Sequence, residues 1–234
     1  MGLQSPQIRP DWLPLLVERP ELNRIDVYFP IQLSTFMSLT TLGLELPTDP
    51  RWVNIAEMNI GDILIDHAYC EQKAASSCIS LIVQYSDKAE LVETLTPVVA
   101  EEWGHFQRVL KELRKRNIPL GRQRKDEYVN QLRSRLRRPI GDQKEQLMDN
   151  LLINALIEAR SCERFKLLSE HIADEGLQKF YRELMISEAG HYRNFIDLAE
   201  TYLPAERVRQ RWKEFLAVEA DIMANLDVRG DRMH

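Results

Sequence analysis

Prolines divide this chain into two unequal parts. Seven of its eleven prolines lie within the first fifty residues, whereas apolar residues recur at three- and four-residue spacing from Trp52 almost to the end. That spacing is typical of amphipathic helices, which proline interrupts. A chain of 234 residues suits one large domain and is cramped for two. We therefore predict an irregular N-terminal arm over residues 1–50 and a single helical domain over residues 51–234.

Helix boundary signals divide the second part into two pairs of long helices. Asp87, Asp142 and Asp174 each stand where a helix can begin, and a glutamate follows each of the first two by three residues. The predicted helices are 52–85, 87–115, a short one over 126–138, 143–172, 174–202 and a last one after Pro204. Two helical hairpins joined by one long crossover are typical of a ferritin-like four-helix bundle. We predict this all-α fold, with the crossover between its second and third long helices and an extra C-terminal helix.

Composition excludes several other classes of protein. A hydrophobic content of 44% is too high for a disordered chain, and three cysteines are too few for a disulfide scaffold. No apolar run approaches the roughly 18 residues of a membrane helix, and nothing after Met1 resembles an export signal. We expect a cytoplasmic protein in which Cys70, Cys78 and Cys162 are reduced thiols.

Two short motifs each place a carboxylate and an imidazole on one face of a helix. Glu102 precedes His105 by three residues, and Glu188 precedes His191 by three, within two of the predicted long helices. Side chains three residues apart lie on the same helix face, so both can bind one metal ion. A single such pair is weak support, because it is equally a surface hydrogen bond.

Register strengthens the interpretation, because two further glutamates lie level with these motifs. Counted from Asp87, Glu102 is 15 residues ahead and Glu71 is 16 behind; counted from Asp174, Glu188 is 14 ahead and Glu158 is 16 behind. Positions equidistant from the turn of a helical hairpin sit at the same height, here about 21–24 Å from each turn. Six ionisable groups inside apolar helices would be very costly to bury without a metal ion.

Glu163 competes with Glu158 for the position on the third long helix, because Cys162-Glu163 echoes Cys70-Glu71. Glu163 is only 11 residues from Asp174, which places it about 7.5 Å out of level with Glu188. We therefore favour Glu158 as the ligand and expect Glu163 to form a salt bridge or to support the ligands.

This set of residues, with no thiolate among them, is typical of a carboxylate-bridged di-iron or di-manganese centre. The glutamate of each motif would bridge the two ions, and each histidine would share one ion with the glutamate that faces it. The predicted metal ligands are Glu71, Glu102, His105, Glu158, Glu188 and His191. Neighbouring residues that could support these ligands are Asp66, Glu101, Arg160 and Tyr192.

Four segments surround these ligands: 64–76, 101–105, 157–165 and 187–192. They resemble the MiaE family of bacterial tRNA hydroxylases, and the run Ile157-Glu-Ala-Arg-Ser-Cys-Glu-Arg-Phe165 is the most specific of them. The likeness covers about residues 50–200. It implies a ferritin-like fold, a non-haem centre of two iron ions, and O₂-dependent hydroxylation of the isopentenyl group of 2-methylthio-N6-isopentenyladenosine beside the tRNA anticodon.

A monooxygenase of this kind needs two external electrons for each turnover. The chain has no Gly-x-Gly-x-x-Gly motif and too few cysteines for an iron–sulfur cluster. A separate electron donor of the ferredoxin or flavin type is therefore implied as a partner.

The charge of the chain is unevenly distributed. Between Arg108 and Arg138 there are twelve basic and three acidic side chains, whereas the whole chain carries −5 and the remainder therefore −14. A concentrated basic patch suits a phosphate-backbone partner such as tRNA, although a merely solvated crossover has the same composition. The candidate tRNA-binding residues are Arg122, Arg124, Lys125, Arg133, Arg135, Arg137 and Arg138.

Two rival functions use the same kind of ligand set. A ferritin-like protein that stores or oxidises iron also places paired carboxylates in a helical bundle, and it would assemble into a large cage. A di-iron oxygenase that acts on a lipid-like substrate would need an apolar channel rather than a basic crossover.

Overall fold

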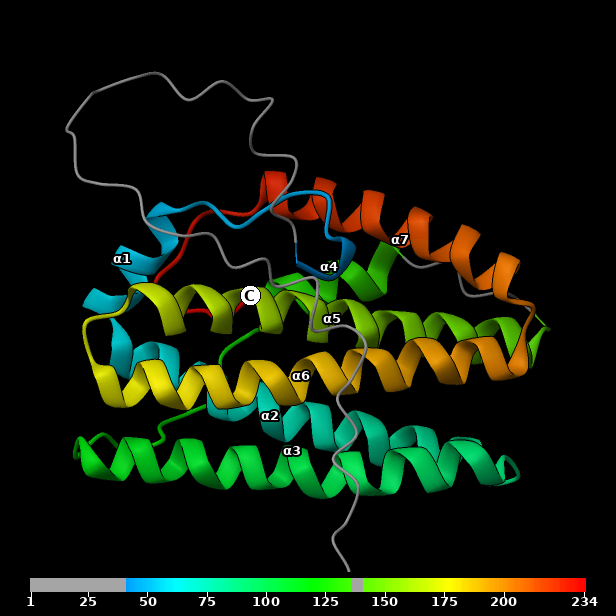
Figure 1. Ribbon diagram of the computed structural model, residues 1–234, viewed down its shortest axis with the longest axis horizontal. Helices are drawn as coiled ribbons and strands as arrows, with labels where there is room; N and C mark the ends of the chain where they lie inside the picture. Colours follow the sequence, from blue (N-terminus) through cyan, green and yellow to red (C-terminus); the bar gives the residue numbers. More distant parts are fainter. Residues whose placement is uncertain (1–40, 136–140) are drawn as a thin grey trace, which may run out of the picture. The chain divides into compact units, whose positions relative to one another are not determined.

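The computed structural model describes residues 41–135 and 141–234, and these residues form seven α-helices and no strand (Figure 1). α2 (Ile60–Gln84) and α3 (Ala89–Lys115) form one antiparallel hairpin, and α5 (Gln143–His171) and α6 (Glu175–Tyr202) form the other. The short helix α4 (Glu127–Arg135) lies in the crossover between them, and α7 (Ala205–Asn225) packs against α4, α5 and α6. This is the predicted bundle, with its long crossover and its extra C-terminal helix.

Two separate apolar clusters fill the bundle. Leu95, Leu152 and Leu198 belong to the first, which joins the start of α3 to the first half of α5 and the end of α6. Leu64 and Leu168 belong to the second, which joins the start of α2 to the second half of α5. Most side chains of both clusters are almost completely buried. Because burial of apolar surface is the main favourable term in folding, these clusters supply the main driving force for packing of the helices. The predicted metal ligands lie along the helices between them.

One predicted helix proves to be two. The expected helix over 52–85 is interrupted at Asn59, where α1 (Arg51–Met58) ends and α2 begins. Asn59 has φ −123° and ψ 31°, outside the helical range, and its side chain donates a hydrogen bond to the Ile55 carbonyl at 2.7 Å. The side chain thus satisfies a carbonyl that the broken helix leaves without an intrahelical partner.

The helix cap predicted at Asp87 is wrong. α3 begins at Ala89, its N-cap residue is Lys88, and no side chain of that residue caps it. A turn closed by the Lys88 N–H and the Tyr85 carbonyl at 3.0 Å delays the helix by two residues. The hydroxyl of Tyr202, at the end of α6, instead accepts from the Leu91 N–H at 3.1 Å. A neighbouring helix therefore provides the acceptor that a local side chain was expected to provide.

The other two predicted caps are confirmed. Asp142 accepts hydrogen bonds from the N–H groups of Lys144 and Glu145 at the start of α5. Asp174 accepts from the Leu177 N–H at 3.0 Å at the start of α6. Asp174 lies at the turn between α5 and α6, so this cap sets the relative levels of residues along those two helices.

After α7 the chain returns to the second apolar cluster. The Met233 side chain is fully buried there, and its N–H donates to the Asp66 carboxylate on α2 at 2.8 Å. Gly230 lies against α1 so closely that an added Cβ would stand 2.4 Å from the Ile55 side chain. Only glycine fits that contact, and residues 227–234 are thereby held against the bundle.

The described residues belong to one compact unit, Met37–His234. Most of the arm predicted over residues 1–50 lies outside the described residues, and the part inside them contains only the short 3-10 helix η3 (Thr41–Gly43). No described helix combines the length and the apolar character that crossing a membrane requires.

Candidate metal centre

The structure brings all six predicted ligands together at the middle of the bundle. They form two overlapping groups of four, in each of which the potential ligand atoms lie within 4.8 Å of one another. Glu102 and Glu188 belong to both groups. All six side chains are buried, with between 1% and 6% of their surface exposed. The residues of the first group are Glu71, Glu102, His105 and Glu188, and those of the second are Glu102, Glu158, Glu188 and His191.

The two histidines point the same ring nitrogen at the carboxylates. Nδ1 of His105 lies 3.2 Å from Glu188 and 3.5 Å from Glu71. Nδ1 of His191 lies 2.7 Å from Glu102 and 3.3 Å from Glu188. The two rings are 5.8 Å apart between centroids. Nδ1 of each histidine therefore lies close to both shared glutamates, Glu102 and Glu188. Two adjacent metal ions bridged by carboxylates would require such an arrangement.

Burial and the mutual contacts of these six side chains raise the pKa values of both histidines and of three of the glutamates, and lower the pKa of Glu188. Burial alone would lower the pKa of His105, but the surrounding carboxylates outweigh it and raise that pKa to about 12. The pKa of His191 is raised to about 11 for the same reason. Burial and the charge of Glu188 raise the pKa of Glu102 to about 7 and that of Glu158 well above its usual value. Without metal, the cluster is thus held together by imidazolium–carboxylate pairs and protonated glutamates.

Several donor atoms of the cluster are buried without a well-directed hydrogen bond. Among the described residues, both carboxylate oxygens of Glu102, Nδ1 of His105 and Oε1 of Glu188 have no partner of acceptable hydrogen-bond geometry. Buried polar atoms are almost always satisfied, and these four lie close to one another. Oxygen and imidazole donors that converge in this way fit iron or manganese. The residues present therefore suit a pair of such ions.

His67 contacts the cluster and is a residue that the sequence reasoning missed. Its Nε2 lies 2.5 Å from Oε1 of Glu71, one helical turn further along α2. The ring is fully buried among Phe165, Phe180 and Tyr181, and burial lowers its pKa to about 3. A neutral imidazole in this position can orient the Glu71 carboxylate. His67 precedes Glu71 by four residues, and this spacing, which places both side chains on one helix face, could have revealed the contact from the sequence.

Glu163 lies apart from the cluster, as the register argument favoured. Its carboxylate accepts from the N–H and the hydroxyl of Thr48 at 3.0 and 2.6 Å, and it pairs with Arg160. Arg160 is fully buried and also donates to Glu219 on α7 at 2.6 Å. Tyr128 on α4 reaches the same carboxylate at 3.2 Å. This buried network joins α4, α5 and α7, so Arg160 stabilises the bundle without contacting a predicted ligand.

The other three residues expected to support the ligands have different positions. Glu101 does contact one, because its carboxylate lies 2.8 Å from Nε2 of His191. Asp66 instead accepts the hydrogen bond from Met233, and Tyr192 packs against Trp212. Only Glu101 of this set therefore touches the cluster directly.

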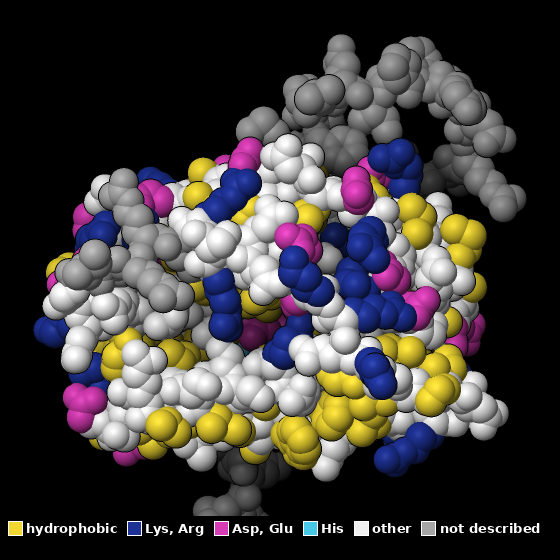
Figure 2. Space-filling view, turned by 180° about the vertical axis from the view of Figure 1, so that it is seen from behind, with side chains coloured by type: hydrophobic (Ala, Val, Ile, Leu, Met, Phe, Trp, Pro, Cys, Tyr) yellow, Lys and Arg dark blue, Asp and Glu magenta, His cyan; other side chains and the backbone are white. Residues whose placement is uncertain are grey.

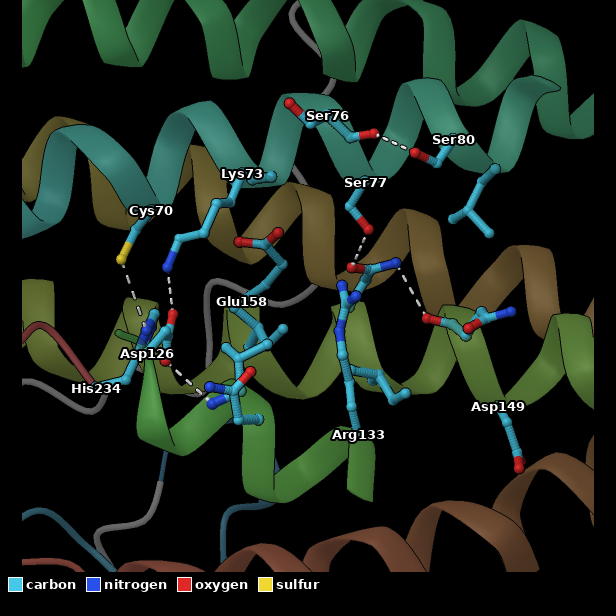
Figure 3. A pocket seen from close by; sticks show the side chains of 18 of the residues that line it. Cys70, Lys73, Ser76, Ser77, Ser80, Asp126, Arg133, Asp149, Glu158 and His234 are labelled. Carbon is cyan, nitrogen blue, oxygen red and sulfur yellow. Dashed lines mark hydrogen bonds and ion pairs between the residues drawn. The ribbon is translucent and has the colours of Figure 1, made fainter. Parts of the chain in front are cut away.

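A pocket of about 1200 Å³ reaches the cluster from the surface. α2, α4 and α5 line it together with residues from the crossover and His234; most of the lining residues are polar or charged, but apolar atoms form somewhat more than half of the exposed wall. Glu158 is the only one of the six predicted ligands among its lining residues (Figure 3). Figure 2 shows Lys and Arg side chains gathered around a hollow in the middle of one face. The cluster is thus approached from solvent at the Glu158 side.

The candidate tRNA-binding residues divide between this pocket and the surface around it. Those that line the pocket are Arg124, Lys125 and Arg133. Arg122 and Arg135 are exposed outside the lining, and Arg137 and Arg138 lie outside the described residues. The sequence reasoning missed a further cation of the lining, Lys73 on α2, which pairs with Asp126.

Ion pairs within the protein already engage some of these cations. Arg124 lies 3.5 Å from Asp231, and Lys125 lies 2.9 Å from Glu127. Arg133 points into the pocket and forms no ion pair with any residue of the described ranges (Figure 3). Arg133 is therefore the lining cation most available to a phosphate.

Known proteins resemble this chain in both sequence and structure. The family model described as tRNA-(MS[2]IO[6]A)-hydroxylase (MiaE) matches residues 36–234. A tRNA 2-(methylsulfanyl)-N(6)-isopentenyladenosine(37) hydroxylase of Pseudomonas putida is 38% identical over 159 residues, which cover 68% of this chain and 76% of that protein. An enzyme of the same name from Salmonella typhimurium is 29% identical, over 88% of this chain and 91% of its own.

Among solved structures, a Synechococcus protein described as having aldehyde deformylating oxygenase activity superposes with a TM-score of 0.76. It is 33% identical in sequence, and the match covers 82% of this chain and 94% of that one. The structural likeness confirms the predicted ferritin-like fold. The family match spans most of the chain, including all six residues of the cluster. This chain belongs to the MiaE family of tRNA hydroxylases.

Proposed function

We propose that this protein is an O₂-dependent monooxygenase that hydroxylates the isopentenyl group of 2-methylthio-N6-isopentenyladenosine in tRNA. Family membership and the names of both relatives support this substrate. The structural observation that carries the proposal is the pocket that runs from the surface to Glu158, with Lys73, Arg124, Lys125 and Arg133 among its lining residues. A nucleotide that enters it from an anticodon loop would reach the cluster while the phosphates stay among the surface cations.

The proposed cofactor is a pair of iron ions. Glu102 and Glu188 would bridge them, Glu71 and His105 would complete one ion, and Glu158 and His191 the other. Two iron ions bound in this way supply reductive activation of O₂ and insertion of one oxygen atom into a C–H bond. The protein orients Glu71 through His67 and His191 through Glu101. The apolar clusters pack on either side of the centre, and the pocket reaches it at Glu158.

The polar lining also bears on the rival substrates. The Synechococcus neighbour is described by an activity on aldehydes, and a lipid-like aldehyde would need an apolar channel. Here the pocket walls carry Lys73, Arg124, Arg133 and several amide and hydroxyl side chains. A nucleotide satisfies such walls better than an alkyl chain does.

Turnover requires two electrons, which we assign to a separate ferredoxin-type or flavin-type reductase. Because the substrate is tRNA, the proposed place of action is the cytoplasm. In this proposal the basic residues around the pocket hold the tRNA: Arg122, Arg124, Lys125, Arg133 and Arg135, with Arg137 and Arg138 on the adjoining segment.

The decisive experiment is mass spectrometry of tRNA nucleosides from cells with and without this protein. In cells without the protein, we expect the loss of an isopentenyladenosine derivative that is heavier by one oxygen atom. The wild-type gene should restore this nucleoside, and a gene carrying Glu188→Ala should not. Unchanged nucleosides would disprove the substrate, whereas iron bound at many atoms per chain would favour the iron-storage function.

The role of the basic residues is tested by Arg133→Glu in tRNA-binding measurements at several salt concentrations. We expect weaker binding and a salt slope reduced by at least about one, since one phosphate contact is lost and a negative charge is added beside the phosphates. Glu163→Gln serves as the matched control, because it changes charge inside the buried network and away from the pocket. Equal slopes for Arg133→Glu and wild type would remove this arginine from the tRNA interface.

A further inference from the structure

A second set of metal-binding side chains lies at one end of the pocket, separate from the six clustered glutamates and histidines. Cys70 comes from α2, Asp126 stands directly before α4, and His234 lies in the segment that follows α7. Their potential ligand atoms lie within 4.8 Å of one another. Figure 3 shows the three side chains meeting at the same end of the pocket. The proposed hydroxylation assigns no role to any of them.

The geometry of His234 is that of a metal-binding histidine. Its Nδ1 lies 3.9 Å from Sγ of Cys70, close to the ~3.6 Å that a tetrahedral zinc ion bonded to a thiolate and an imidazole implies. Its other nitrogen, Nε2, lies 2.9 Å from the Ser161 hydroxyl, and the ring stacks on Tyr128 at 5.2 Å. Histidines that bind metal ions are held in this way through the second ring nitrogen.

We propose that Cys70, Asp126 and His234 form a third metal site, which binds Zn²⁺ or a similar divalent transition metal. A sulfur, an imidazole and a carboxylate together suit zinc rather than magnesium or calcium. On binding, the S–H bond of Cys70 is broken, its proton leaves to solvent, and a sulfur–metal bond forms. Three protein ligands would leave a fourth position for water or another ligand.

Lys73 forms an ion pair that opposes metal binding at this site. Its ammonium group pairs with the Asp126 carboxylate, which is also the proposed metal ligand. The ammonium group and a divalent ion therefore compete for one carboxylate. Removal of the ammonium group should favour the ion, and this competition separates a real site from three residues that merely lie close together.

The test is a titration of the iron-loaded, full-length protein with Co²⁺, followed by near-ultraviolet absorbance. A thiolate bound to Co²⁺ gives a charge-transfer band, and the six clustered ligands include no thiolate. The band therefore reports only on a cysteine site, whichever metal fills the other centre. We expect a band that saturates at one Co²⁺ per chain and disappears when Zn²⁺ is added.

Variants locate the site. Cys70→Ser should abolish the band, His234→Ala should weaken Co²⁺ binding at least about tenfold, and Lys73→Met should strengthen it about tenfold. Cys162→Ser is the matched control, because this buried thiol lies elsewhere, against the Met185 carbonyl, and its loss should leave the band unchanged. Absence of the band in the wild-type protein, or its persistence in Cys70→Ser, would overturn the proposal.

Discussion

The two halves of the six-residue cluster have equivalent ligands and unlike surroundings. The half formed by Glu71 and His105 is closed, because Glu71 contacts His67 inside a set of buried aromatic rings. The half formed by Glu158 and His191 is open: Glu158 lines the pocket, and His191 contacts Glu101, whose side chain is 56% exposed.

This difference separates two requirements of an oxygenase. In the closed half, the rings packed around His67 hold the Glu71 carboxylate in place, which favours stable metal binding. The open half gives a substrate a path to the centre. The shared glutamates join the two halves, so a set of residues that looks symmetrical in sequence has asymmetrical surroundings.

The largest expected effect comes from removing a shared ligand. Glu188→Ala should abolish stoichiometric iron binding, because this glutamate belongs to both groups. Glu158 belongs to only one group, so Glu158→Ala should lose the ion of the open half and retain most of the ion of the closed half. Iron per chain, measured by elemental analysis, gives the answer, with Glu163→Gln expected to retain both ions. Full iron occupancy in Glu188→Ala would refute the centre, and greater loss in the Glu163 variant would overturn the register argument.

The closed half should depend on His67. His67→Phe keeps a ring among the aromatic neighbours but removes the contact with Glu71, so we expect metal affinity to fall about 10- to 100-fold. Titration against a competing chelator measures the loss, and near-ultraviolet circular dichroism checks that the aromatic packing is retained. An affinity equal to that of the wild type would mean that ring packing alone closes this half.

In one respect the halves should behave alike. The pKa values of His105 and His191, about 12 and 11 in the metal-free protein, lie above the ordinary 6.5, so both rings carry a proton at neutral pH. Their contribution to metal-free stability is complete below pH 6.5 and is lost only as the pH rises through 11–12.

Metal binding must displace these protons, so affinity for each ion should rise about tenfold for each pH unit near neutrality. Isothermal titration calorimetry in buffers of different ionisation enthalpy counts the protons released. If no protons are released, the histidines are already neutral and the imidazolium–carboxylate pairs do not exist.

The smallest expected effect concerns Glu101 at the open half. Its side chain is mostly exposed, and solvent weakens its interaction with His191, so Glu101→Gln should change metal affinity by no more than about threefold. A loss as large as that of His67→Phe would show that the open half is held as firmly as the closed one, and the contrast between the halves would fail.

That the six predicted ligand residues lie together could be predicted from the sequence, because helix geometry fixes their levels. A constant rise per residue converts distance from a turn into height in the bundle, and Glu71 and Glu158 follow from that rule alone. The cap predicted at Asp87 was wrong, but the observed N-cap, Lys88, is only one residue away, so the predicted levels are nearly unchanged. His67 was missed although its spacing from Glu71 carried the signal.

The pocket could not be predicted in the same way. Lys73, Asp126 and His234 meet there from α2, the crossover and the segment after α7. No periodicity relates these positions, because tertiary packing of irregular segments brings them together. The close approach of Gly230 to Ile55 and Asn59, where the first predicted helix breaks, likewise joins positions far apart in the chain.

The two shared glutamates also have a mechanical consequence. Glu102 belongs to the α2–α3 hairpin and Glu188 to the α5–α6 hairpin, so each group of ligands takes three residues from one hairpin and one from the other. A bound ion would therefore act as a cross-link between hairpins. Removal of the metal should loosen the seam between the hairpins while each remains folded, and amide hydrogen exchange would rise along that seam first.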